Sequence, residues 1–177
     1  MAYTVPTTQS SGNVIGASDW NTDLVENIKH LADPPRVSTY RNADQTITTA
    51  TETIPLFNAE TYDTDTMHST SSNQGRLVAA TAGLYVCTLK VFFAAATTGY
   101  RQARIYLNGV GVEVIDEATN DSPSSSTTTA LACYVERFLD VGEYVEASCY
   151  HTRGSNLALL GTGDRETTFT ARWVAVS

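Results

Sequence analysis

Residues 83–93 constrain the fold more than any other part of the chain. Alternate side chains from Tyr85 to Phe93, including Leu89 and Val91, are apolar, as a β-strand with one buried face requires. The intervening set that starts at Leu84 is also largely apolar. A strand that is apolar on both sides is not half-solvated, so its second face must be covered too.

The chain from residue 36 onward has the period-two pattern of an all-β protein. Short alternating runs separated by turn residues are typical of a β-sandwich. A polar loop is expected at 120–129, and Asn108-Gly109 is expected to turn a hairpin because both residues tolerate positive φ. The predicted strands are 36–41, 45–49, 52–58, 75–81, 83–95, 101–108, 111–116, 129–138, 143–151, 155–160 and 167–175.

A helix is expected between a polar arm at residues 1–17 and the pair Pro34-Pro35, which ends it. Ser18 is the predicted N-cap. An apolar stripe on this helix must be buried against something, either its own sandwich, two further copies in a three-helix stem, or another protein. The stripe consists of Trp20, Leu24, Ile28 and Leu31.

Charge and length exclude several function classes. The chain has 177 residues, enough for one domain and a short appendage, and a net charge of −8 with only two lysines. No basic cluster exists to bind phosphates, so we expect no nucleic-acid partner. No apolar run reaches the roughly 20 residues of a membrane span, and residues 1–16 lack a signal-peptide pattern. We therefore expect no membrane partner and synthesis in a reducing cytosol.

The three cysteines do not form a metal or disulfide pattern. Cys87, Cys133 and Cys149 are an odd number, lie in strand-like runs and have no C-x-x-C spacing. We predict that all three are buried free thiols.

Three motifs give residues 36–177 a resemblance to a known fold. They are Gly83-x-Tyr85, Asn108-Gly109 and Leu139-x-x-Gly142-Glu143-x-Val145, and an aromatic strand near the C-terminus follows them. This order resembles the C1q/TNF-like jelly roll, a sandwich that usually acts as a homotrimer. Where this chain has Gly142-Glu143, that family usually has Gly-Asp. The resemblance implies an all-β jelly roll whose core or trimer contacts include Tyr85, Leu89, Val91, Phe93, Phe169 and Trp173.

A second resemblance concerns the N-terminal part. Residues 15–21, followed by Leu24, Asn27 and Leu31, are similar to the opening of tailed-bacteriophage virion proteins, and residues 63–68 resemble a stretch found in the same setting. The resemblances together imply two parts: an arm and helix at 1–35 that serve as virion anchor or trimer stem, and a jelly roll at 36–177. The implied protein is a head decoration, head fibre or tail-associated component, located in the virion after synthesis in the host cytoplasm.

Two acidic groups and one histidine are the candidate sites for other chemistry. Glu60, Asp63 and Asp65 could offer oxygen ligands to calcium, but they lack the glycine turn of an EF-hand, so solvated loops are favoured and no cofactor is expected. Asp116, Glu117 and Asp121 form a second acidic patch, with the same interpretation.

His151 lies near Ser148, Tyr150 and Asp164 in the sequence, but no nucleophile elbow accompanies them. We therefore predict no enzyme and no catalytic residue. His30, near the end of the predicted helix, is interpreted as a favourable charge there. The alternative function is an adhesin that recognises a host surface glycan or protein through its outer loops.

Overall fold

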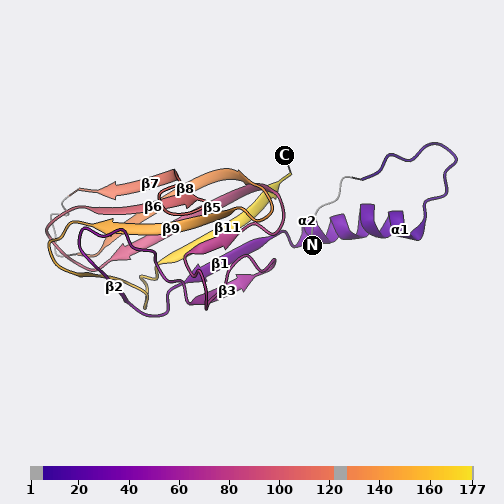
Figure 1. The fold of residues 1–177 in the computed structure, drawn as a ribbon. Helices are drawn as coiled ribbons and strands as arrows, with labels where there is room; N and C mark the ends of the chain where they lie inside the picture. Colours follow the sequence, from indigo (N-terminus) through magenta and orange to yellow (C-terminus); the bar gives the residue numbers. More distant parts are fainter. Residues whose placement is uncertain (1–5, 122–126, 177) are drawn as a thin grey trace.

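The strand predicted at residues 83–93 lies in the middle of a two-layered β-sandwich. One helix projects from this sandwich (Figure 1). The structure is a computed structural model that describes residues 6–121 and 127–176. The strand β5 (Gly83–Phe93) pairs along its whole length with β8 (Thr129–Leu139). Its other edge is shared by β11 (Thr168–Ala175) and the short β10 (Leu157–Leu159).

Within the described residues the larger sheet has seven strands. Its order is β2-β10-β5-β11-β1-β3, with β8 added at β5. The remaining members are β1 (Arg36–Tyr40), β2 (Gln45–Ile47) and β3 (Ala59–Asp63). The smaller sheet has the order β4-β9-β6-β7 among the strands described. Its members are β4 (Arg76–Val78), β6 (Arg101–Leu107), β7 (Glu113–Asn120) and β9 (Tyr144–His151).

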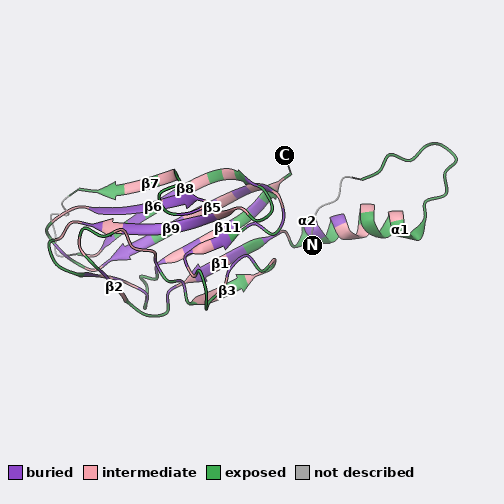
Figure 2. Ribbon diagram, in the orientation of Figure 1, coloured by how far each residue is buried: buried purple, intermediate pink, exposed green. Residues whose placement is uncertain are grey.

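The core lies between the two sheets and is built by the predicted alternation. On β5 the inward residues from Tyr85 to Phe93 are fully buried, and on β6 Ala103 and Ile105 face them from the other layer. Figure 2 shows this as buried colour along the inner strands and exposed colour in the loops and the helix. The all-β sandwich predicted from the period-two pattern is confirmed.

Two predicted strands, 52–58 and 111–116, differ clearly from the structure. The strand at 52–58 is wrong, because in that stretch only Thr53 makes an isolated bridge, to Cys149, and Pro55 has no N–H to donate. β3 follows instead at Ala59–Asp63, on an edge where neither side is fully buried, so no alternation marks it. The strand predicted at 111–116 starts two residues later and runs to Asn120. Of the predicted loop at 120–129, residues 122–126 lie outside the described part.

The helix runs from residue 17 to residue 32 in three consecutive pieces, α1 (Ala17–Asp19), η1 (Trp20–Glu26) and α2 (Asn27–Ala32). The predicted N-cap is wrong: Gly16 caps the helix, and its N–H donates to the Asp19 carboxylate at 3.3 Å. The middle piece is π-helical, which the sequence does not indicate. The helix ends before Pro34, as predicted.

The helix continues the long direction of the sandwich and touches it only near its C-terminal end (Figure 1). There His30, 1% exposed, packs its ring edge-on against Trp173. His30 is therefore buried between the helix and the last strand, while its interpretation as a favourable charge at the helix end stays a prediction. None of the helices in the described residues has the length and apolar character needed to cross a bilayer.

Candidate functional site

The outer face of the seven-stranded sheet is the most distinctive surface of the described residues. It is formed by the side chains of β5, β8 and β11 that point away from the core. Because successive residues of a strand point to opposite faces, these are the positions between the core residues. On β5 and β8 they are Leu84, Val86, Thr88, Lys90, Phe92, Ala130, Ala132, Tyr134, Glu136 and Phe138.

Strand register arranges this face in rows. Tyr134 on β8 is opposite Thr88 on β5, which is opposite Thr170 on β11. One step along the strands, Glu136 is opposite Val86, which is opposite Arg172. Each row therefore crosses three strands at one height along the strand direction.

Large apolar side chains on this face remain in contact with water in a single subunit. Tyr134 is 60% exposed, Val174 44% and Phe138 37%. Lys90 stands over the Phe92 ring at 4.7 Å from its centroid, and this cation–π contact covers part of that ring. No other element of the described chain lies on this face, so its apolar area is available to another molecule.

The six sandwich residues predicted as core or trimer contacts lie on the inner side instead. Five of them are fully buried, and Trp173 is 6% exposed. They belong to the core of the sandwich, and the residues between them on each strand face the outside of the sheet. The sequence carries the signal for that second set, because Tyr134 and Glu136 alternate with Leu131, Cys133 and Val135.

The contact between Gly83 and Trp173 explains why glycine opens the Gly83-x-Tyr85 motif. A Cβ on residue 83 would overlap the Trp173 Nε1 atom, and Gly83 has φ of +152°. The indole N–H donates to the Ala82 carbonyl at 3.1 Å, while the Tyr85 hydroxyl donates to the Thr81 carbonyl at 2.6 Å. Glycine at 83 thus lets the aromatic of the last strand close this end of the core.

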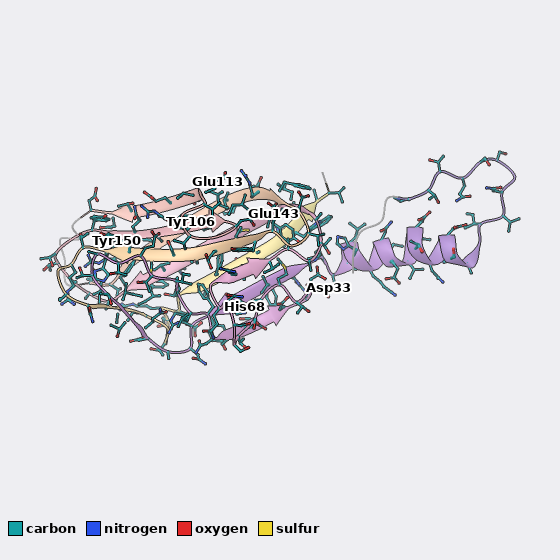
Figure 3. All side chains as sticks on the ribbon, viewed as in Figure 1. Asp33, His68, Tyr106, Glu113, Glu143 and Tyr150 are labelled. Carbon is teal, nitrogen blue, oxygen red and sulfur yellow. The ribbon has the colours of Figure 1, made fainter. Side chains whose placement is uncertain are left out.

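The Asn108-Gly109 turn and the turn that contains Gly142-Glu143 are in contact. Asn108 and Gly109 have φ of +55° and +120° and turn the chain between β6 and β7, as expected. The Asn108 amide donates to the Glu143 carboxylate at 2.9 Å, and the Asp140 N–H donates to the other oxygen of Glu143 at 3.0 Å. Hydrogen bonds from Asp140 and Asn108 hold the pKa of Glu143 below its ordinary value. Glu143 therefore joins the two turns at the helix-proximal end of the sandwich (Figure 3).

Comparison with solved structures decides the fold. The globular domain of zebrafish complement 1qA matches with a TM-score of 0.54 and 15% identity, over 81% of this chain and 99% of that one. Murine APRIL matches with a TM-score of 0.59 and 12% identity, over 79% and 98%. Eiger TNF from S. frugiperda matches with a TM-score of 0.55 and 9% identity, over 81% and 95%. The fold is a C1q/TNF-like jelly roll. No family model and no curated protein matches the sequence.

The helix that precedes the jelly roll has an exposed apolar stripe. Ile28 is 55% exposed and Leu31 65% exposed. The stripe therefore does not pack on its own sandwich, which excludes the first of the three possibilities considered for it. Its four members are Trp20, Leu24, Ile28 and Leu31.

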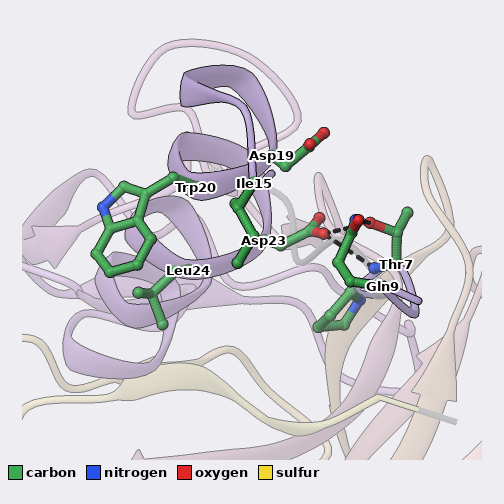
Figure 4. Close-up of a pocket in the computed structure, with 8 residues that line it drawn as sticks. Thr7, Gln9, Ile15, Asp19, Trp20, Asp23 and Leu24 are labelled. Atoms are coloured by element: carbon green, nitrogen blue, oxygen red, sulfur yellow. Dashed lines mark hydrogen bonds between the residues drawn. The ribbon is translucent and has the colours of Figure 1, made fainter. Parts of the chain in front are cut away.

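The N-terminal arm folds back along part of the helix and encloses a pocket of about 240 Å³ (Figure 4). Trp20 and Leu24 supply apolar walls, and the Thr7 backbone N–H and hydroxyl both donate to one oxygen of Asp23, at 2.9 and 2.6 Å. These hydrogen bonds hold the pKa of Asp23 below its ordinary value.

The first acidic group is occupied by protein contacts in the described structure. Asp63 accepts backbone N–H groups from Asp65, Met67 and His68 at 2.9 to 3.2 Å. Glu60 lies 2.7 Å from His68 Nδ1, and Asp65 accepts the Thr81 hydroxyl at 2.9 Å. These carboxylates shape the connection after β3, and among the described residues no three His, Cys, Asp or Glu side chains converge as metal ligands. The expectation of no cofactor stays a prediction.

Two members of the second acidic patch also have defined roles. Asp116 on β7 accepts the backbone N–H of Tyr134 on β8 at 2.6 Å, and Glu117 accepts from Arg104 Nε at 2.6 Å. Asp116 therefore links the edges of the two sheets, while the exposed Asp121 follows the end of β7.

The residues considered for hydrolysis point to opposite sides of β9. His151 is fully buried and its Nε2 lies 3.1 Å from the Ile47 carbonyl oxygen, so burial lowers its pKa. Ser148 is also fully buried but lies on the other face of β9, and its hydroxyl donates to Glu52 at 2.7 Å. Tyr106 also donates to Glu52, at 2.6 Å. The geometry therefore gives Ser148 a carboxylate partner and not a histidine base.

All three cysteines are buried and free, as predicted. Burial raises the pKa of the Cys87 and Cys149 thiols to about 12. Burial, with the nearby Asp116 carboxylate, also raises the pKa of Cys133 to about 12. Its thiol donates to the Ala103 carbonyl at 3.3 Å across the sandwich.

Proposed function

We propose that the chain is a non-enzymatic structural protein that assembles as a homotrimer through the outer face of its seven-stranded sheet. The observation that carries this proposal is the exposed apolar set on that face, with Tyr134, Phe138 and Val174 its largest members. Burying the apolar area that these side chains still expose stabilises an assembly by about 25 cal/mol per Å². Domains with the C1q/TNF-like fold typically form homotrimers, which supports the same conclusion.

The helix supports a particular direction for the three-fold axis. It continues the long direction of the sandwich, and the strands run the same way (Figure 1). An axis parallel to the strands brings three helices together at one end of the trimer. Their stripes, which include Trp20 and Ile28, are then buried in a three-helix stem, and an otherwise marginal short helix gains tertiary support.

The biological setting that we propose is a tailed-phage particle. The similarity of residues 15–31 and 63–68 to phage virion proteins supports it. Residues 1–35 attach the trimer to capsid or tail proteins, and the jelly rolls project from the particle as a head decoration, head fibre or tail-associated protein. An acidic surface with two lysines keeps such a densely displayed protein soluble.

Sedimentation of the purified chain tests the trimer. We expect a species of three subunits, and a Thr88→Arg variant that places a bulky cation in the middle of the assembly face is expected to dissociate. The matched control is Thr119→Arg on β7 of the other sheet, which leaves the mass unchanged. A stable single subunit at high concentration would refute the proposal.

Particle incorporation tests the attachment role. A chain that lacks residues 1–35 is added, in parallel with the full chain, to phage particles grown without the protein. We expect the full chain alone to co-sediment with particles. Incorporation of the shortened chain at the same level would contradict the assignment of residues 1–35.

One observation favours a second candidate, an adhesin that binds a host glycan. Tyr100, just before β6, and Tyr150 on β9 are both partly exposed, with their ring centroids 5.6 Å apart and the ring planes at 32°. Tyr150 lies toward the end of the sandwich opposite the helix (Figure 3). An aromatic pair with a free side suits a sugar ring. Glycan-array binding that a Tyr150→Ala change abolishes would establish this function, and an array without signal would dismiss it.

A further inference from the structure

Among the described residues of the assembly face, one acidic and one basic side chain lack an ionic partner and, unlike Lys90, do not lie over an aromatic ring. Glu136 on β8 and Arg172 on β11 are both exposed. The Glu136 carboxylate accepts only the Tyr134 hydroxyl, at 3.3 Å. No ion pair in residues 6–121 and 127–176 includes either side chain. Charges on a face that becomes buried need partners, because an unpaired buried charge is costly.

These two side chains cannot easily satisfy each other within one subunit. They belong to the same row, with Val86 of β5 between them. Two strand spacings amount to about 9.6 Å, and the apolar valine occupies the intervening position. On its other side, Arg172 is directly opposite another cation, Arg36 of β1.

The positive charge of Arg36 repels that of Arg172, so an anion beside Arg172 would be stabilising. Like charges opposite each other on neighbouring strands are destabilising. Arg36 is compensated by Asp33, whose carboxylate lies 3.1 Å away. No such carboxylate accompanies Arg172 among the described residues, so a carboxylate supplied by a second copy of the chain would stabilise it.

The symmetry of the proposed trimer indicates which carboxylate can pair with Arg172. This step rests on the proposed trimer with its axis parallel to the strands. A rotation about that axis does not change height along it, so each row of one subunit meets the same row of the next subunit. We propose that Glu136 of each subunit pairs with Arg172 of its neighbour, and that the occupant of this face is therefore a second copy of the chain.

The neighbouring row fits the same arrangement. Tyr134 extends from β8, and its row continues across Thr88, Thr170 and Ser38, which have small side chains. A tyrosine from the next subunit can lie on these small residues while Glu136, two residues further along β8, reaches the row of Arg172. Because the two contacting patches differ, the contact is heterologous, and the proposed three-fold rotation closes it into a ring. The ion pair fixes the height at which the subunits meet.

Charge reversal tests the pair in the full chain. The proteins are wild type, Glu136→Lys, Arg172→Glu and the double variant, measured by sedimentation over a dilution series in about 0.15 M salt. We expect each single reversal to raise the concentration of half-dissociation at least about tenfold, because like charges then meet across the interface. In the double variant we expect the concentration of half-dissociation to return to within about threefold of the wild-type value. Asp121→Lys and Arg153→Glu, on the other sheet and a distant loop, are matched controls that leave it unchanged.

Distinct results overturn distinct claims. Single reversals that leave a wild-type-like trimer, or a double variant that fails to recover, refute the ion pair while the trimer stands. Single reversals that lower the unfolding temperature of the subunit without changing its mass show that the charges act inside one subunit, which also refutes the pair. A wild-type chain that is monomeric at every concentration removes the proposed function and the pair together.

Discussion

The His30 ring lies edge-on against the Trp173 indole, with the two ring centroids 4.5 Å apart and the planes at 84°. His30 belongs to the helix and Trp173 to the last strand of the sandwich. An aromatic pair of this kind contributes about 0.5 to 1.5 kcal/mol beyond the area that it buries. This contact therefore sets how firmly the projecting helix is seated on the jelly roll.

A His30→Ala change is expected to loosen the helix without unfolding the sandwich. The loss of about 1 kcal/mol corresponds to roughly fivefold faster amide exchange in residues 27–32. Hydrogen exchange with mass analysis measures this, with Lys29→Ala on the exposed side of the same helix as control. Equal exchange in His30→Ala and wild type would show that the ring contact does not hold the helix.

Gly83→Ala is expected to destabilise the sandwich by at least about 2 kcal/mol, because the new Cβ would overlap the Trp173 indole in a positive-φ position. Gly142→Ala is the matched control. Gly142 has φ of +88°, but a Cβ added there would meet no atom within 4 Å, so only the backbone cost of about 1 kcal/mol applies. Chemical denaturation gives both values. Equal losses for the two variants would mean that the contact with Trp173 adds nothing.

Stability in acid is expected to depend on Glu52. Partial burial raises the pKa of this carboxyl group, but hydrogen bonds from Tyr106, Ser148 and Arg104 outweigh it, so the pKa lies below the ordinary 4.5. A lowered folded-state pKa means that the stabilisation is complete above the ordinary value and is lost as pH falls through the folded one. Thermal unfolding between pH 7 and pH 3 measures the effect.

Glu52→Gln should therefore be less stable than wild type at pH 7, by about 1 to 3 kcal/mol, because the charged hydrogen bonds are lost. The difference should narrow as the pH falls below about 4.5, where wild-type Glu52 begins to lose its charge. A difference that stays constant from pH 7 to pH 3 would rule out the ionised carboxylate as its cause.

The three thiols are expected to resist modification in the native protein. A pKa of about 12 leaves almost no thiolate at pH 8, and burial blocks access. A thiol reagent should label fewer than about one cysteine in ten in the time that unfolded chain reacts completely. Fast labelling of Cys133 in particular would indicate that β8 opens from β5.

The sandwich could be predicted because its inner positions repeat with period two over long strands. The runs around Tyr85, Ile105 and Phe169 each place apolar residues on one side, and the structure buries that side. β3 lacked this signal because both its sides are partly exposed. The segment 52–58 resembles a strand in the sequence because it contains the apolar Phe57. In the structure Phe57 is buried, but it belongs to an irregular connection.

The candidate site was only partly predictable. The helix stripe follows from spacing alone, and Trp20, Leu24, Ile28 and Leu31 are exposed as such a stripe must be before it finds a partner. The importance of Glu136 and Arg172 could not be inferred, because it depends on which residues are opposite each other across three strands. That register comes from long-range pairing, which local sequence does not encode.

The carboxylate of Asp116, which accepts the backbone N–H of Tyr134, has a consequence for how copies of this chain can polymerise. β8 ends the larger sheet on one side, and a bare strand edge is a template on which foreign strands extend a sheet without limit. A negative charge that already holds one of those donors makes such growth unfavourable. Extension of the sheet at this edge is thereby disfavoured, which is compatible with the proposed trimer, where copies meet through flat sheet surfaces.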